Sequence, residues 1–238
     1  MRPLAAAGGR LTILLIATAL LAGSATLQQE KTSPAFTSPT APADRPLPGA
    51  ILAVPAPLTD PSLGLRAGPV PVPVELLLPS LNQRIPVLGV GITPTNVMDA
   101  PMGPAESPVW QQAFWYRGSA VPGERSSALI AGHISDPLGR PGVFANIGSL
   151  RAGDPIIVHD IRTGLDVRFT VTDATSYPIE QTTDPAVLTQ IYGAGPVAGT
   201  WAQPSADGRS YLTLITCDGT FRNGTHDHRL VVHATRVV

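Results

Sequence analysis

The sequence predicts an all-β domain that closes, or nearly closes, into a β-barrel. From about residue 76 the chain breaks into short apolar runs, each bounded by Gly, Pro, Asn or Asp. That composition is typical of strands joined by turns. The run from Asp166 to Thr172 alternates apolar and polar residues with period two, as a half-buried strand does. Only two segments are candidates for helices, so strands must supply most of the core.

Seven strands are predicted, in chain order, at residues 84–92, 110–116, 127–133, 155–159, 166–172, 211–217 and 229–237. Pro86 in the first strand indicates a sheet edge or a bulge, because proline cannot donate a ladder hydrogen bond. Short helices are predicted at 143–150 and 185–192. For the second helix, Asp184 is the expected N-cap and Pro185 the first helical residue.

The N-terminal segment, residues 1–27, predicts export. Arg2 and Arg10 precede an apolar run from Leu11 to Leu27, which is at the short edge of what can span a bilayer. The small residues Gly23-Ser24-Ala25 would suit a cleaved signal peptide. An uncleaved anchor with its N-terminus inside fits the positive charges before the run, and we favour it.

A proline-rich extracytoplasmic linker is predicted at residues 28–75. Twelve of the 26 prolines lie between residues 28 and 79, and such density blocks helices and central strands. The folded catalytic domain is then expected to span residues 76–238.

The composition excludes several classes of function. The formal charge is −1 with no basic block, so a nucleic-acid partner is not expected. Lys31 is the only lysine among sixteen basic residues, which excludes a catalytic lysine within the folded domain. Cys217 is the only cysteine, so the chain forms no intramolecular disulfide.

Cys217 ends a predicted strand and precedes Asp218-Gly219, a dipeptide typical of turns. The thiol is therefore expected at a rim that a substrate can reach. A buried, inert thiol is the alternative, since free cysteines are often core residues. An ordinary thiol with a pKa of about 8.5 is only about 3% ionised at neutral pH, so a reactive one needs a base or a cation nearby.

His133 is the best candidate for that base. It closes the apolar run Ala128–His133, and Gly132 before it allows close backbone approach. His159 and His233 are predicted to be ordinary structural histidines. The triplet at residues 226–228, His-Asp-His, could suggest a metal ligand set, but no remote partner completes one.

Two arginines compete for the role of fixed cation. Arg229 heads the last predicted strand, and a loop would bring it close to Cys217 if the two strands are neighbours. A cation held there could stabilise a developing oxyanion. Arg222 lies in the middle of the predicted loop, where its position would be less well fixed.

The whole pattern resembles the sortases, bacterial cysteine transpeptidases, and is most similar to the class F type of high-GC Gram-positive bacteria. The resemblance covers about residues 74–238. Leu212-Thr-Leu-Ile-Thr-Cys217 matches the family signature T-L-x-T-C, and Ala131-Gly-His133 matches its histidine motif. Arg229 falls where the family's arginine starts the last strand. Further similar segments, in the family order, are 84–90, 96–101, 115–124 and 142–154.

The resemblance implies an eight-stranded β-barrel and a thioester mechanism. Cys217 would be the nucleophile, His133 the acid and base, and Arg229 the group that stabilises the oxyanion or holds the substrate backbone. Thr216 matches a family position that contacts the substrate. No metal ion or organic cofactor is implied.

The implied donors are secreted proteins that carry a C-terminal sorting signal of the LPxTG kind, cut between Thr and Gly. The acceptor would be an amine of a peptidoglycan precursor or of a pilin, and we expect a monomer held at the membrane by its N-terminal segment. Two alternatives stay open. An L,D-transpeptidase-like cell-wall enzyme would also use Cys and His, but its S-H-G-C run is absent. A non-catalytic, wall-associated binding domain would need none of the three residues.

Overall fold

The computed structural model describes residues 57–95, 97–184, 186–188 and 201–237, and the statements below concern these residues. They belong to one compact unit, Pro46–Val238. The predictions for residues 1–27, for the linker before residue 57 and for the end of the second helix lie outside the described residues.

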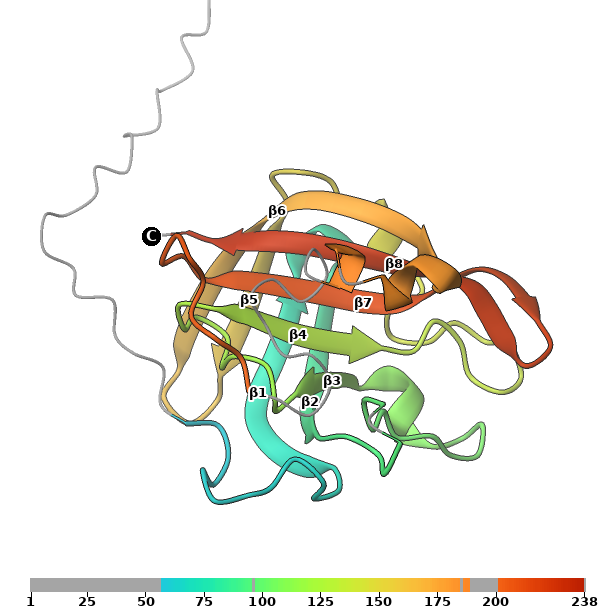
Figure 1. Cartoon of the computed structure of the whole chain (residues 1–238), viewed down its shortest axis with the longest axis horizontal. Coiled ribbons are helices and arrows are strands. Elements are labelled where there is room, and N and C mark those ends of the chain that lie inside the picture. Colours follow the sequence, from blue (N-terminus) through green and yellow to red (C-terminus); the bar gives the residue numbers. More distant parts are fainter. Residues whose placement is uncertain (1–56, 96, 185, 189–200, 238) are drawn as a thin grey trace, which may run out of the picture. The chain divides into compact units, whose positions relative to one another are not determined.

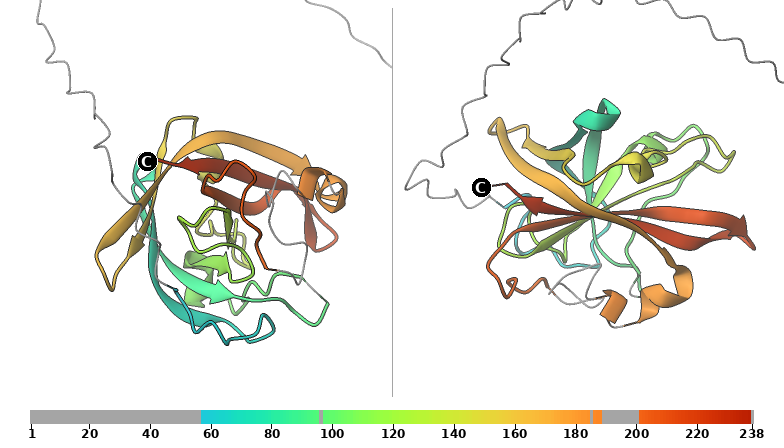
Figure 2. Two further views of the ribbon diagram at one scale, coloured as in Figure 1. Left: turned by 60° about the vertical axis from the view of Figure 1, so that its left-hand side comes forward. Right: turned by 90° about the horizontal axis from the view of Figure 1, so that it is seen from above.

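Eight strands form a closed barrel in the order β1-β2-β3-β4-β7-β8-β6-β5 (Figures 1 and 2). The pairs β2–β3 and β4–β7 are parallel, and the other neighbours are antiparallel. The all-β prediction is confirmed. The strands are β1 (Val70–Leu78), β2 (Gln83–Val90), β3 (Ala113–Tyr116), β4 (Ser127–Gly132), β5 (Pro155–Asp160), β6 (Leu165–Pro178), β7 (Tyr211–Arg222) and β8 (Thr225–Arg236).

Alternate side chains of each strand fill the barrel. On β7, Leu212 and Leu214 are fully buried in the main hydrophobic cluster, together with Val232 and Ala234 of β8. Because side chains alternate between the two faces of a strand, the intervening residues point away from this interior. Cys217, an odd-numbered residue of β7, therefore lies on the outer face of the barrel.

The helical predictions are only partly right. Four single 3-10 turns occur in the described chain: η1 (Pro79–Leu81), η2 (Pro108–Gln111), η3 (Ile147–Ser149) and η4 (Ile179–Thr183). The helix predicted at 143–150 shrinks to η3. Asp184 does cap a helical segment, since its Oδ1 accepts a hydrogen bond from the Ala186 N–H at 2.7 Å.

The strand predicted at 110–116 is wrong in its first half. Ser107 and Pro108 instead start the turn η2, where the Ser107 Oγ accepts from the Val109 N–H. Proline at the first position suits such a turn because its missing N–H would be unpaired there anyway. Strand β3 therefore begins only at Ala113.

The linker prediction needs a correction at its end, because β1 begins at Val70, within the segment 28–75. Its valines at 72 and 74 are buried, while the intervening Pro71 and Pro73 are more exposed. Prolines were expected to block a strand here. They are tolerated because they alternate with the residues that pack, and a register shift between Pro71 and Glu75 loosens the ladder with β2.

Pro86 occupies the kind of position that was predicted. The β2–β3 ladder starts one residue later, at Val87, so the missing N–H of Pro86 breaks no bond to β3. The irregularity lies opposite, in β1, between Pro71 and Glu75.

The stretch from Asp218 to His228 was predicted as a loop, and this is wrong. β7 and β8 continue through it as a two-stranded ribbon that extends past the barrel (Figure 1). Asn223 and Gly224, both with positive φ, form its turn, the geometry of a tight two-residue hairpin. Gly219 has φ +75° and lies at a register shift, so it forms a bulge rather than the end of the strand.

Among the described residues, no helix is both long enough and apolar enough to cross a membrane.

Candidate active site

Cys217 and Arg229 lie directly opposite each other across the β7–β8 pair. Directly opposed residues of an antiparallel pair project to the same face, with Cβ atoms about 5 Å apart. Both residues are partly buried. The register of β7 and β8 therefore places Arg229 close to the thiol, as predicted.

His133 reaches the same place from the other side of β7. Strands β4 and β7 run parallel, and their last backbone pair is Ala131 with Ile215. Two residues further along each strand come His133 and Cys217. Residues that are in register on parallel neighbours share a face, so the imidazole and the thiol emerge together on the outer surface.

A side-chain hydrogen bond continues the β4–β7 connection at this edge. Thr216 Oγ1 donates to the Gly132 carbonyl at 2.8 Å, and Thr216 is only 4% exposed. Its side chain thus faces the barrel interior and is already bonded. The predicted contact of Thr216 with substrate stays a prediction, and this burial favours a structural role.

Gly132 is needed for packing next to the histidine. A Cβ atom on Gly132 would come within 2.6 Å of the Phe144 ring and 2.9 Å of Val143. The Phe144 N–H in turn donates to the His133 carbonyl at 3.0 Å. The backbone of Gly132 and His133 is therefore held in place by its packing against Val143 and Phe144 and by the hydrogen bond from the Phe144 N–H.

The imidazole of His133 is packed between aromatic rings. The centroid of Trp110 lies 4.6 Å from it and that of Phe114 5.3 Å. Its Nε2 is 2.8 Å from the carbonyl oxygen of Pro101. Burial lowers the pKa of His133 from its ordinary value, and the Pro101 carbonyl opposes that shift in part. At neutral pH the imidazole is therefore mostly neutral and available as a base.

Arg229 is held by its own strand. Its Nη1 donates to the carbonyl of His228 at 2.9 Å and to that of His226 at 3.4 Å. Within the described residues, no hydrogen bond engages its Nε or Nη2. Arg222 pairs with Thr225 at the exposed tip of the ribbon, five residues beyond Cys217, so it is not placed at the thiol.

The histidines of the ribbon form a local network. Asp227 Oδ1 accepts from the Thr220 N–H at 2.7 Å and lies 2.8 Å from His228 Nδ1. These contacts lower the pKa of Asp227, His228 being the largest cause. In the part of the chain that the structure describes, no group of three or more His, Cys, Asp and Glu side chains could hold a metal.

The two histidines predicted to be structural lie away from the thiol. His159 pairs with Asp166 on β6 at 2.8 Å. His233 lies on β8 between Asp173 and Thr213. Burial lowers the pKa of His233, and Asp173 opposes the shift.

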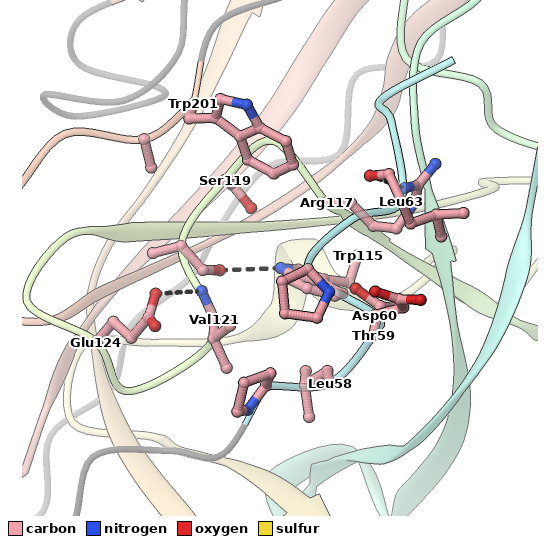
Figure 3. A pocket seen from close by; sticks show the side chains of 14 residues that line it. Leu58, Thr59, Asp60, Leu63, Trp115, Arg117, Ser119, Val121, Glu124 and Trp201 are labelled. Atoms are coloured by element: carbon pink, nitrogen blue, oxygen red, sulfur yellow. Dashed lines mark hydrogen bonds between the residues drawn. The ribbon is translucent and has the colours of Figure 1, made fainter. Parts of the chain in front are cut away.

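A separate cavity has a volume of about 340 Å³. It is lined by Trp115, Arg117, Glu124 and Trp201, together with the segment before β1 (Figure 3). Arg117 follows the end of β3, and β4 starts only at Ser127. His133 follows the other end of β4, so this cavity is remote from the thiol.

The family model for the sortase domain matches residues 76–237. The chain belongs to the sortase family. It is therefore a cysteine transpeptidase that processes proteins bearing sorting signals, and sortases act outside the cytoplasm. No curated protein sequence matches the chain significantly.

Several solved sortase structures are similar to this sortase. Sortase C-1 from Actinomyces oris is 21% identical, with a TM-score of 0.45, over 69% of this chain and 73% of that one. A lid mutant of sortase A from Corynebacterium diphtheriae is 22% identical, with a TM-score of 0.48, over 73% of each chain. Sortase C1 from Streptococcus agalactiae, in complex with MTSET, is 20% identical, with a TM-score of 0.45, over 69% and 67%.

Sequence reasoning missed the surroundings of His133. Residues 96–101 were noted only for their similarity to a family segment, and the described part of this segment is a loop whose Pro101 carbonyl lies against the imidazole. Trp110 was placed in a strand and not beside the histidine. A contact made by a main-chain carbonyl leaves no signal in residue type, so only the fold reveals it.

Proposed function

We propose that this sortase cleaves an LPxTG-like motif between Thr and Gly and passes the acyl group, through a thioester on Cys217, to an amine. The observation that carries the proposal is the placement of three residues around β7. Cys217 lies on β7 opposite Arg229 of β8, and His133 directly follows β4, the parallel neighbour of β7. A thiol, a base and a fixed cation on one face suit acyl transfer.

In the first half-reaction, His133 takes the proton from the thiol, and the sulfur attacks the carbonyl carbon of the motif's Thr. The carbon–sulfur bond forms and the carbonyl oxygen becomes negatively charged. When this intermediate collapses, the carbon–nitrogen bond to Gly breaks. Protonated His133 gives its proton to the leaving amine, so the thioester and a free amino terminus result.

In the second half-reaction, the acceptor amine attacks the thioester carbonyl and a carbon–nitrogen bond forms. His133 removes a proton from the nitrogen, the carbon–sulfur bond breaks, and the leaving thiolate takes that proton from His133. An amide replaces the thioester, and no oxidant, metal or organic cofactor is needed. The acceptor is proposed to be a peptidoglycan-precursor amine or a pilin amine.

Arg229 is the proposed partner of the negative oxygen. Its guanidinium carries five N–H donors, and Nη1 is the one engaged by its own strand. The remaining donors could hold either the oxyanion or the backbone carbonyls of the motif. Its fixed position opposite the thiol favours it over Arg222.

A groove beside the three residues is the proposed path for the donor peptide. It has a volume of about 510 Å³ and is lined mainly by residues of β6, β7 and β8, among them Tyr177, Thr213 and His233, and on β7 its lining ends at Thr213. Thr213 lies four residues before Cys217, or about 13 Å along an extended strand. A sorting motif of five residues fits that span.

The location and class are also proposed from the sequence. Residues 1–27 carry the charge pattern of an N-terminal anchor with its N-terminus inside. The motifs around His133 and Cys217 support class F within the family. A monomer is proposed because one chain supplies all three residues.

The test is a peptide-library cleavage assay with intact-mass detection of the acyl-enzyme, with glycine and diaminopimelate analogues supplied as amines. We expect an adduct on Cys217 that resolves onto an amine. Cys217→Ala should fold and form no adduct, whereas cleavage by that variant would refute the mechanism. An adduct that only hydrolyses would indicate a protease. If the folded protein, with a titratable thiol, forms no adduct with any peptide, the result would favour a non-catalytic, wall-associated binding domain.

A further inference from the structure

The hydrogen bond between His133 and Pro101 determines which nitrogen of the imidazole carries a hydrogen, as well as the position of the ring. A main-chain carbonyl has no proton to donate, so it can only accept. The His133 Nε2 atom, 2.8 Å from this oxygen, must therefore carry a hydrogen. In a neutral imidazole the other nitrogen, Nδ1, is then unprotonated and is the basic atom.

We propose that the Pro101 carbonyl is a positioning group of this enzyme, which holds His133 as its Nε2–H tautomer and leaves Nδ1 to exchange protons with Cys217 and the amines. Cysteine and serine acyl-transfer sites commonly orient their base with a third group. Here no side-chain hydrogen bond to His133 occurs among the described residues, and the main chain takes that place.

The carbonyl is itself held in place by a second layer of hydrogen bonds. Trp110 Nε1 donates to the Pro104 carbonyl at 2.8 Å, and Arg140 Nη2 donates to the Ala105 carbonyl at 2.6 Å. Arg140 is also paired with Asp136, just after β4. Three carbonyls of residues 101–105 thus accept from side chains, so the segment is fixed from several directions.

Apolar packing fixes the start of the same segment. Met98 and Ala100 pack against the cluster that contains Trp110 and Phe114. These two rings are also the ones that flank the imidazole of His133. Trp110 therefore has two roles, because it packs against the ring and anchors the segment that bonds to it.

The hydrogen bond to the Pro101 carbonyl affects both the neutral and the protonated form of His133 in the catalytic cycle. With a hydrogen on Nδ1 instead, Nδ1 could not accept a proton from the thiol. Once Nδ1 has been protonated, the Pro101 carbonyl accepts from an imidazolium, and such charge-assisted bonds are stronger than neutral ones. The carbonyl therefore favours the state that must protonate the leaving amine.

The test reads the tautomer directly by 15N NMR of the full chain, labelled at histidine. His133→Gln identifies the signal. In the unchanged protein we expect a protonated Nε2 and an unprotonated Nδ1. Trp110→Phe keeps a ring but removes the donor to Pro104, and Arg140→Gln removes the donor to Ala105. Each should give a mixture of tautomers and lower kcat about 10-fold to 100-fold, with KM little changed.

A matched control separates this role from a loss of folding. Arg151→Gln removes an arginine that also donates to main-chain carbonyls, those of Gly148 and Leu150 in and just after η3, and not to residues 101–105. This variant should retain the Nε2–H tautomer and kcat. Thermal unfolding of every variant shows whether it folds.

An Nδ1–H tautomer in the unchanged protein would overturn the proposal. So would an unaltered tautomer in a folded Trp110→Phe or Arg140→Gln variant whose kcat has fallen. The kinetic readout rests on the proposed peptide substrate, whereas the NMR readout needs no substrate. Failure of the proposed function would therefore leave the tautomer result intact, and the two are distinguishable.

Discussion

Removing the residues before position 76 should destabilise the barrel strongly. The family match begins at residue 76, and the proline-rich composition suggested the same boundary. The structure places β1 from Val70 onward, paired with β2 on one side and β5 on the other. A chain that starts at residue 76 loses most of that strand and leaves two unpaired edges.

The cost follows from two groups of contacts. Val72 and Val74 are 9% and 3% exposed, and burying a valine contributes about 1.5 kcal/mol, or about 3 kcal/mol for the pair. The buried Arg117 donates to the carbonyls of Gly64 and Ala67 at 3.1 and 2.6 Å. Each such bond contributes about 1 kcal/mol net, because water replaces the partner after truncation.

The total is about 5 kcal/mol, which is comparable to the whole stability of many domains. For a domain of this size it corresponds to a fall in the unfolding midpoint of about 10–20 °C. A chain that starts at residue 69 keeps β1 but loses the hydrogen bonds to Arg117, and also the one from the Ile92 N–H to the Leu65 carbonyl. It should lose at least about 2 kcal/mol, so the contribution of β1 can be separated from that of the segment before it.

The assay compares chains that begin at residues 57, 69 and 76 by thermal and denaturant unfolding, with aggregation followed by light scattering. The expected order of stability is 57, then 69, then 76. If the shortest chain unfolds within about 2 °C of the longest, at equal denaturant slope, the assignment of β1 to the cooperative barrel is wrong.

Three further outcomes are expected. Arg229→Ala should lower kcat/KM about 10²-fold. Arg222→Ala, at the ribbon tip, should have little effect. The reverse order of the two effects in steady-state kinetics would contradict the register between β7 and β8. Thr216→Val should lower the free energy of unfolding by about 1–2 kcal/mol, because the carbonyl before His133 loses its buried partner, whereas Thr216→Ser should not. A change in KM alone would instead support a substrate contact. Burial lowers the pKa values of His133 and His233, so the unfolded chain binds more protons below the ordinary histidine pKa. Stability should therefore fall as the pH drops from about 7 to 5, and replacing both histidines by Gln should flatten that slope in unfolding measurements.

The catalytic strands were predictable because their signals are local. Alternation at residues 229–237 places Arg229 and His233 on one face and Val232 and Ala234 on the other, and the structure agrees. The register that sets Cys217 opposite Arg229 follows from a hairpin between neighbouring strands. A ribbon was harder to see, because Asp218-Gly219 has the composition of a turn but forms a bulge.

Two other features depend on the tertiary structure. Prolines 71 and 73 oppose a strand by local preference, yet Val72 between them and Val74 after them are buried in the closed barrel. Packing thus overrides propensity in β1. The contact between His133 and the Pro101 carbonyl joins residues 32 positions apart, and only the folded path of the segment before η2 creates it.

The topology explains why the proposed nucleophile and base can be far apart in sequence and still meet. β4 and β7 are parallel neighbours in register up to Ala131 and Ile215, so His133 and Cys217, each two residues further on, reach the same edge of the barrel. β8 is antiparallel to β7, so Arg229, opposite Cys217, lies near the start of β8. A slip of one residue between β4 and β7 would turn Cys217 inward and Thr216 outward. The buried bond from Thr216 to Gly132 opposes that slip at the point where the register matters most.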